Sequence, residues 1–419
     1  MARTLFTNAS VFDGTGSAPF PAEVLIEGNR VAAVAQAPGR IAREGAAVVD
    51  CAGATLMPGM IEAHAHLSWP SSVGRVINAM MLPPEEHLLI TAHNAKVTLD
   101  SGFTAAYSAG SLGARFEVAL RDEIDAGYLP GPRLITSSIE RAPANVLGVP
   151  KSHEKAHGRG PEALGEYVAA RAKDGVDSIK FLLSGDDGFS PGGGRTLTYS
   201  EDEARAIGEA AKRNDLWLAC HAQAAESVQM ALRHGWRILY HCSYADEKTL
   251  DLIEAKKDEV FVAPAVGLLW TRMHEAEEFG IDRKKAEEMG AVSGIERMQR
   301  LYPEMKKRGI RVLPGGDYGF PYNPIGRNAR DLEYFVTLFG YSPREALSAA
   351  TKLGGELMGM AGELGLIKQG ALADILLIGG DPTQDVTILQ DSDRITAIMK
   401  DGAFHKPPAA QPRHAIAAE

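Results

Sequence analysis

Short apolar runs alternate with segments of helical periodicity between residues 59 and 357. Stretches such as 202–213, 225–234 and 246–255 repeat apolar positions at helical spacing. Between such stretches lie eight apolar runs, as expected for parallel strands that are buried on both faces. Eight strand–helix units predict an α/β fold, a (β/α)8 TIM barrel, with a doubly wound sheet as the alternative. The runs span residues 60–66, 103–108, 133–137, 178–183, 216–221, 237–241, 260–265 and 311–315.

Both ends of the chain have the pattern of short β-strands instead. We therefore expect one small, discontinuous β-sandwich domain from residues 1–58 and 358–419, interrupted by the barrel domain of residues 59–357. The Pro- and Ala-rich tail from Lys406 onward is expected to be disordered. The strand-like runs lie at residues 5–12, 22–27, 30–34 and 48–51, and again at 374–378 and 395–399.

The composition argues against several classes of partner. A net charge of -10 with 44 Lys and Arg residues is not the electrostatic pattern of a nucleic-acid-binding protein. No apolar stretch approaches the ~20 residues of a membrane span, so we expect no membrane partner. Three cysteines make no disulfide framework. The first residues lack the apolar core of a signal peptide, which fits a cytoplasmic protein; a protein whose leader has been removed would be secreted or periplasmic.

Residues that can bind a metal fall at the ends of the predicted barrel strands. His64 and His66 end the first run, and on a strand their side chains point to the same face. The active sites of such barrels lie at the C-terminal ends of the strands, so these positions would meet at one mouth. The other candidates are Lys180 in the fourth run, His221 in the fifth, His241 in the sixth and Asp317 after the eighth.

The donor set indicates two metal ions. Neutral imidazoles and carboxylates suit Zn²⁺ or a similar first-row ion. Four histidines and one aspartate exceed one tetrahedral shell. Lys180 differs from the others, because a protonated lysine would repel cations. It becomes a ligand if its amine adds CO₂ to form a carbamate that bridges two metals; a surface lysine, a Schiff-base lysine and a buried ion-pair partner are the alternatives.

These six positions resemble the binuclear site of the amidohydrolase superfamily. The segment 50–59 resembles that family's approach to its first strand, and residues 370–375 with 380–382 resemble its closing segment. The resemblance covers nearly the whole chain. Within the superfamily, the pattern is similar to the imidazolonepropionase-like branch that includes prolidase-type carboxypeptidases.

The resemblance implies a role for each residue. His64 and His66, with Asp317, would hold the more buried ion, and His221 and His241 the more exposed one. Carboxylated Lys180 would bridge both ions, which are expected to be Zn²⁺. Asp317 would be the catalytic residue that takes a proton from the attacking water and passes it to the leaving amine. Similar family members are octamers, so a homo-oligomer is expected.

The implied activity is hydrolysis of a small-molecule amide. The expected substrates are N-acyl amino acids or dipeptide-like compounds cleaved at the C-terminal amide, and specifically ochratoxin A, which would give ochratoxin alpha and L-phenylalanine. One alternative is a mononuclear deaminase or cyclic-amide hydrolase, a class that typically lacks the lysine of the fourth strand. A non-enzymatic scaffold that has lost its ligands is the other alternative.

The sequence departs from this family at two places. Relatives usually carry an Arg-Asp pair in the second strand, where residues 104–110 have none, and a Gly-Gly-His after the third, where residues 142–145 read Ala-Pro-Ala-Asn. His153 is then the candidate for the histidine that contacts the substrate carbonyl. Apolar loops that carry Met81 and Trp270 are candidates for binding the acyl side of the substrate, unless they pack on one another or on another subunit.

Overall fold

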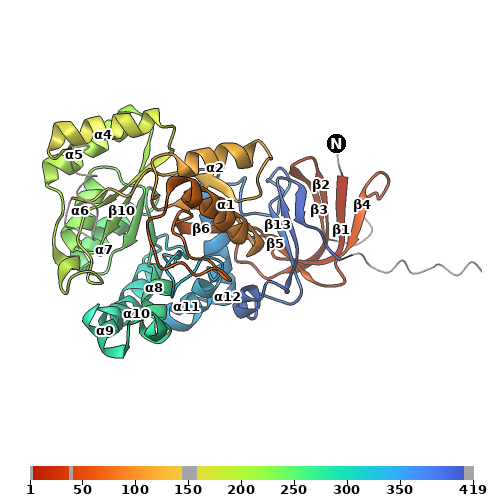
Figure 1. Cartoon of the computed structure of the whole chain (residues 1–419). Helices are drawn as coiled ribbons and strands as arrows, with labels where there is room; N and C mark the ends of the chain where they lie inside the picture. Colours follow the sequence, from red (N-terminus) through yellow and green to blue (C-terminus); the bar gives the residue numbers. More distant parts are fainter. Residues whose placement is uncertain (1–2, 37–40, 144–157, 410–419) are drawn as a thin grey trace, which may run out of the picture.

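The computed structural model describes residues 3–36, 41–143 and 158–409. Strands from both ends of the chain share one eight-stranded sheet, on the right of Figure 1, in the order β15-β14-β13-β5-β1-β2-β3, with β4 paired to β1. The two ends meet where β5 and β13 pair antiparallel. The sandwich form and the domain bounds stay predictions. The strands are β1 Arg3–Val11, β2 Phe20–Glu27, β3 Arg30–Ala35, β4 Ala47–Asp50, β5 Thr55–Pro58, β13 Ile375–Ile378, β14 Ile395–Lys400 and β15 Ala403–Lys406.

The middle of the chain forms two parallel sheets. One has the order β6-β7-β8 and the other β12-β11-β10-β9. A bridge between Ser137 and Ser178 connects them, and Val312, in the eighth run, pairs with Val262. The alternating α/β pattern is thus present, while closure into one barrel stays a prediction. The strands are β6 Met60–Ala65, β7 Phe103–Ser108, β8 Arg133–Ile135, β9 Ser178–Leu182, β10 Trp217–Ala222, β11 Ile238–His241 and β12 Phe261–Ala263.

Helices follow these strands and cover them. Of the three helical stretches expected above, α5 begins after a capping box, in which Ser200 and Glu203 each accept a backbone N–H of the other. The helices are α1 Pro84–Asp100, α2 Phe116–Asp125, α4 Pro161–Lys173, α5 Glu201–Arg213, α6 Ala225–Arg233, α7 Glu247–Ala255, α8 Val266–His274, α9 Arg283–Glu288, α10 Ala291–Lys307, α11 Arg330–Phe339, α12 Pro343–Ser348 and α13 Gly354–Leu357.

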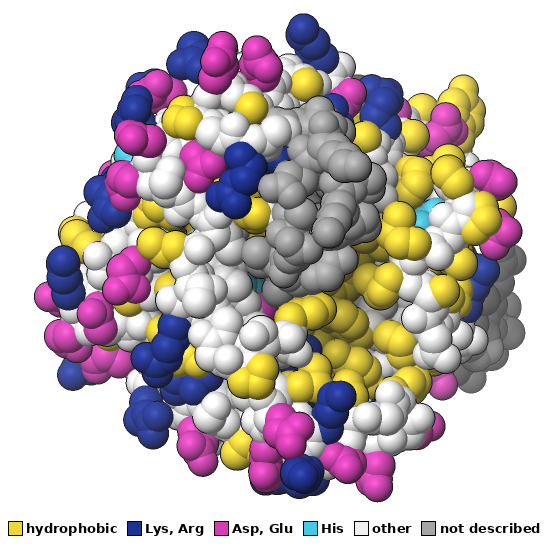
Figure 2. Space-filling model, turned by 60° about the vertical axis from the view of Figure 1, so that its left-hand side comes forward, with side chains coloured by type: hydrophobic (Ala, Val, Ile, Leu, Met, Phe, Trp, Pro, Cys, Tyr) yellow, Lys and Arg dark blue, Asp and Glu magenta, His cyan; other side chains and the backbone are white. Residues whose placement is uncertain are grey.

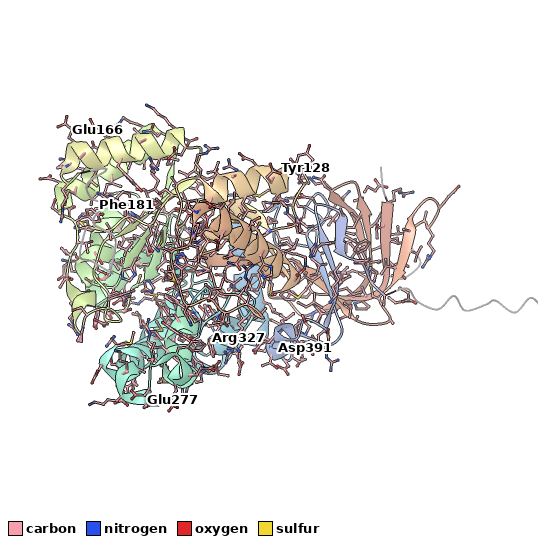
Figure 3. The ribbon with its side chains drawn as sticks, in the orientation of Figure 1. Tyr128, Glu166, Phe181, Glu277, Arg327 and Asp391 are labelled. Carbon is pink, nitrogen blue, oxygen red and sulfur yellow. The ribbon has the colours of Figure 1, made fainter. Side chains whose placement is uncertain are left out.

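The packing of α4 on β9 illustrates how the helices hold the strands. The ring of Tyr167 meets the ring of buried Phe181 edge-on, with centroids 5.9 Å apart. Glu166, the neighbouring residue on α4, points outward and is exposed (Figure 3). Because side chains alternate along a strand, Lys180 and Leu182 point to the other face, toward a cavity that both of them line. Within the described part of the chain, no helix is long and apolar enough to cross a membrane.

Candidate metal centre

The structure places all six predicted ligands around one cavity of about 300 Å³. They come from four strands and from the segment after the eighth run, which are far apart in the sequence and meet at the C-terminal ends of the strands. Whether they bind metal stays a prediction. The six are His64, His66, Lys180, His221, His241 and Asp317.

The backbone is strained at three of the strand ends that meet there. His241, Ala265 and Asp317 have φ angles of 74°, 60° and 60°, in the left-handed region that non-glycine residues rarely adopt. The hydroxyl of Tyr302 donates a hydrogen bond to the carbonyl of His241, which helps to hold that conformation. Strain of this kind is kept where the surrounding structure enforces it, and it concentrates at functional sites.

The histidine tautomers leave a lone pair free on each of two rings. His66 Nδ1 lies 3.0 Å from the carbonyl oxygen of Gly110, and His221 Nε2 lies 3.0 Å from that of Gly185. A carbonyl only accepts, so these nitrogens carry the protons and the opposite nitrogens can bind a metal. His66 Nε2 lies 3.2 Å from Asp317 Oδ1, so these two ligand atoms can share one ion.

Two of the imidazoles are held neutral. Burial lowers the pKa of His64 well below its ordinary value, and the nearby positive charge of Lys180 lowers it further. Burial has the same effect on the pKa of His241, together with its neighbour His221. Neutral imidazole is the form that binds metal ions.

The residues fit a cation. The ligand atoms of His64, His241 and Asp317 all lie within 4.8 Å of one another. Among the described residues, buried Asp317 Oδ1 has no hydrogen-bond partner, and it lies 3.7 Å from His64 Nε2. Such an atom is rare because leaving it unsatisfied is costly, and a metal ion would satisfy it. The chain therefore carries a candidate His/Asp metal site.

Lys180 has an ion-pair partner that the sequence did not indicate. Its Nζ lies 3.1 Å from Glu140 Oε1 and donates to the carbonyl of Ala109 at 3.1 Å. It also lies 4.4 Å from the centre of the Tyr240 ring. The side chain is buried. This is the geometry of a buried ion pair, one of the alternatives considered above, and carboxylation of Lys180 stays a proposal.

Two further charged residues line the cavity, and sequence reasoning missed both. Asp186 follows β9; its Oδ2 accepts from Gln223 Nε2 at 2.7 Å and lies 3.6 Å from His221 Nε2. Arg272 lies on α8 and is 4% exposed. The position of Asp186 just after strand β9 is a signal that could have found it. Arg272 lies in the last turn of a helix and carries no such signal.

Two further buried carboxyls hold, by hydrogen bonds, the segments that carry His64 and Asp317. Glu62 Oε1 accepts the backbone N–H of His64 at 2.8 Å. Asp331, on α11, accepts the N–H of Gly315 at 2.8 Å and the hydroxyl of Tyr318 at 2.9 Å. Burial raises the pKa of Glu62 to about 8 and that of Asp331 to about 7. These bonds fix the two segments that carry His64 and Asp317.

The cavity wall is largely apolar, and the structure separates the three substrate-binding candidates. Met81 lines the cavity and is 56% exposed. Trp270 packs against His274 and Tyr334, outside the lining, so the structure does not bring it to the cavity. His153 lies outside the described residues. Figure 2 shows hydrophobic side chains gathered around a hollow on one face of the molecule. The apolar lining includes Trp69, Met80, Leu112, Ile139, Leu182, Phe189, Leu268 and Phe320.

Known proteins resemble this chain over most of its length. A family model described as the amidohydrolase family matches residues 55–404. Ochratoxinase of Aspergillus niger is 23% identical over 388 residues, covering 85% of this chain and 77% of that protein. Imidazolonepropionase of Sphingopyxis alaskensis is 21% identical over 368 residues, covering 81% and 82%. A crystal structure of an Xaa-Pro dipeptidase with bound methionine superposes with a TM-score of 0.83 at 23% identity, covering 97% of this chain and 100% of that one.

Proposed function

Because this chain belongs to the amidohydrolase family and is thus a metal-dependent hydrolase of amide or peptide bonds, we propose that it holds two divalent ions, which we take to be Zn²⁺. The proposed reaction is cleavage of the C-terminal amide of N-acyl amino acids or dipeptide-like substrates. The observation that carries the proposal is the convergence of six potential ligands on one apolar cavity. We also propose that the two parallel sheets and the eighth run close into the (β/α)8 barrel of the family.

The ligands would divide between the two ions as follows. His64 and His66, with Asp317, would hold one ion, and His221 and His241 the other. Lys180, carboxylated by CO₂, would bridge them. For this, Lys180 must give up its ion pair with Glu140, whose side chain is 24% exposed and can turn toward solvent. When bound, the ions supply Lewis-acid polarisation of the substrate carbonyl and activation of water.

The chain's own residues would carry the proton and the substrate. Asp317, at 6% exposure, lies among the ligands, where its carboxylate can take a proton from the attacking water and deliver it to the leaving amine. The net reaction adds one water across the amide and releases a carboxylic acid and an amine. The apolar wall around Met81 and Phe189 would hold the acyl group.

Ochratoxin A is the specific substrate that we propose. It joins an aromatic acyl group to phenylalanine through an amide, so it offers an apolar part for the cavity wall and a scissile bond for the metal centre. The similarity to a protein named ochratoxinase supports this choice. The proposed products are ochratoxin alpha and L-phenylalanine.

The test is product analysis with the zinc-saturated protein. Liquid chromatography should detect L-phenylalanine and the aromatic acid in equal amounts, and elemental analysis should find two ions per chain. Release of phenylalanine from simple N-acyl-phenylalanines but not from ochratoxin A would retain the amide hydrolase and remove the specific substrate. One ion per chain at full activity would favour a mononuclear enzyme.

A further inference from the structure

Arg272 places a positive charge in the wall of the cavity. The side chain is 4% exposed, and its Nε has no hydrogen-bond partner. Within the described part of the chain, its one hydrogen bond, from Nη2 to the hydroxyl of Tyr322, is long at 3.5 Å. Among the residues that the structure describes, no carboxylate forms an ion pair with it. Arginine keeps its charge at all physiological pH values, so this guanidinium is always a cation.

Neighbouring arginines show that this chain normally pairs such charges. Arg297 lies 3.3 Å from Asp187, and Arg330 lies 2.5 Å from Glu275. A buried charge without a partner is strongly destabilising, so a fold retains one where a ligand completes it. Arg272 is therefore a candidate binding site for an anion.

Arg272 would bind that anion in the same cavity as the predicted metal ligands. It lines the cavity that also holds the predicted metal ligands, and its charge is among the causes that lower the pKa of His241. Asp186 lines the same cavity, yet its two oxygens accept from Gln223 and from the backbone of Gly188. Arg272 Nη1 and Asp186 Oδ1 both lie beside Gly188 without forming an ion pair, so the guanidinium can still accept a ligand from the cavity.

We propose that Arg272 binds the α-carboxylate of the amino acid that the enzyme releases, an inference that rests on the proposed amide hydrolysis. The planar guanidinium offers two parallel N–H groups that match the two oxygens of a carboxylate. One such cation neutralises one monoanion. With the carboxylate held by Arg272 and the acyl group against the apolar wall, the scissile carbonyl lies between them, at the metal ligands. Arg272 is in this way a specificity-determining residue that selects amides with a free carboxylate.

The test compares two substrates with two forms of the enzyme. The substrates are N-benzoyl-phenylalanine and its carboxamide, which differ only in the charged group; the enzymes are the zinc-saturated wild type and Arg272→Met. We expect the wild type to prefer the acid in kcat/KM by about tenfold to a hundredfold, the usual worth of a charge-assisted pair. Arg272→Met should lose that preference through KM, so that it cleaves the acid and the carboxamide at similar rates.

Controls separate recognition from folding. Arg297→Met removes a nearby arginine that has its own carboxylate, so it should keep the preference for the acid. Arg272→Met should raise the Tm of the substrate-free protein, because it removes an unpaired buried charge, whereas loss of a structural arginine would lower it. Arg272→Lys keeps the charge without the planar fork and should retain part of the preference.

The outcomes also distinguish a failure of this inference from a failure of the proposed amide hydrolysis. If Arg272→Met keeps the full preference for the acid, or if the wild type cleaves acid and carboxamide equally well, Arg272 is not the carboxylate site, while amide hydrolysis stands. If the wild type cleaves neither compound and no other N-acyl amino acid, the proposed function fails, and the role of Arg272 fails with it.

Discussion

The free energy of unfolding should depend on pH through Glu117, a carboxyl on α2 that is 1% exposed. Its Oε2 accepts the backbone N–H of Ser137, beyond the end of β8, at 3.1 Å. Burial raises the pKa of Glu117 from 4.5 to about 8, against hydrogen bonds from Ser108 and Ser137 that lower it. The group is therefore protonated in the folded protein at neutral pH, although it would be ionised in the unfolded chain.

The sign follows from the protons that each state holds. Below pH 4.5 both states hold the proton, and Glu117 has no pH-dependent effect. From pH 4.5 to about 8 the unfolded chain has lost a proton that the folded protein keeps, so unfolding becomes easier as the pH rises. At about 1.4 kcal/mol per pH unit, the loss reaches at most about 5 kcal/mol by pH 8. Glu117→Gln, which cannot ionise, should escape this loss.

Urea unfolding at pH 5, 6, 7 and 8, with equal metal loading, measures the difference between wild type and Glu117→Gln. That difference should grow in favour of the variant with each pH step. Asp246→Asn is the matched control: hydrogen bonds from Thr249 lower the pKa of this helix cap, so it is ionised in both states throughout and its effect should be constant. A difference for Glu117→Gln that stays constant from pH 5 to 8 would refute the reasoning.

Three further predictions concern the site itself. Lys180→Ala should lose metal, measured by elemental analysis, and activity together, with partial rescue by short carboxylic acids; wild-type rates would exclude the bridge. Asp317→Asn should lower kcat about 10²- to 10⁴-fold with little change in KM, and a loss below about tenfold would remove it from proton transfer. Met81→Ala should raise KM for ochratoxin A about threefold to thirtyfold, whereas Trp270→Ala, outside the cavity lining, should lower Tm and leave KM unchanged; the reverse result would restore Trp270 as a substrate contact.

The seven strands in the middle of the chain could be predicted to within a few residues because burial on both faces makes each of them a mainly apolar run. The eighth run, 311–315, is weaker: it contributes a bridge at Val312, since Pro314 has no N–H to donate and Gly315 has no side chain to pack. Strands β5 and β15 were missed. Each has four residues, too few for an alternating pattern to be distinguished from a turn.

The candidate ligands could be found from the sequence because strand ends meet by the geometry of the fold, whatever the details. His64 and His221 needed only that rule. The partners of Lys180 and the isolation of Arg272 follow instead from contacts between segments that are far apart in the sequence. Glu140 reaches Lys180 across 40 positions of the chain, and no local periodicity encodes such a distance. Residues that act through long-range pairing, or through the lack of it, become visible only in three dimensions.

Charge balance gives a physical reason for the state of Lys180 to change when metal binds. With neutral imidazoles, the charged groups of the cavity are Glu140, Asp186 and Asp317 against Lys180 and Arg272. An ammonium at Lys180 is compatible with this cavity because Glu140 balances it. Divalent ions next to that ammonium would raise the positive charge steeply in a setting with little solvent to screen it. Conversion of the ammonium to a carbamate lowers the local charge by two, the charge of one divalent ion. Metal binding and carboxylation should therefore be coupled, so that each is favoured by the other and Zn²⁺ affinity rises with the CO₂ concentration.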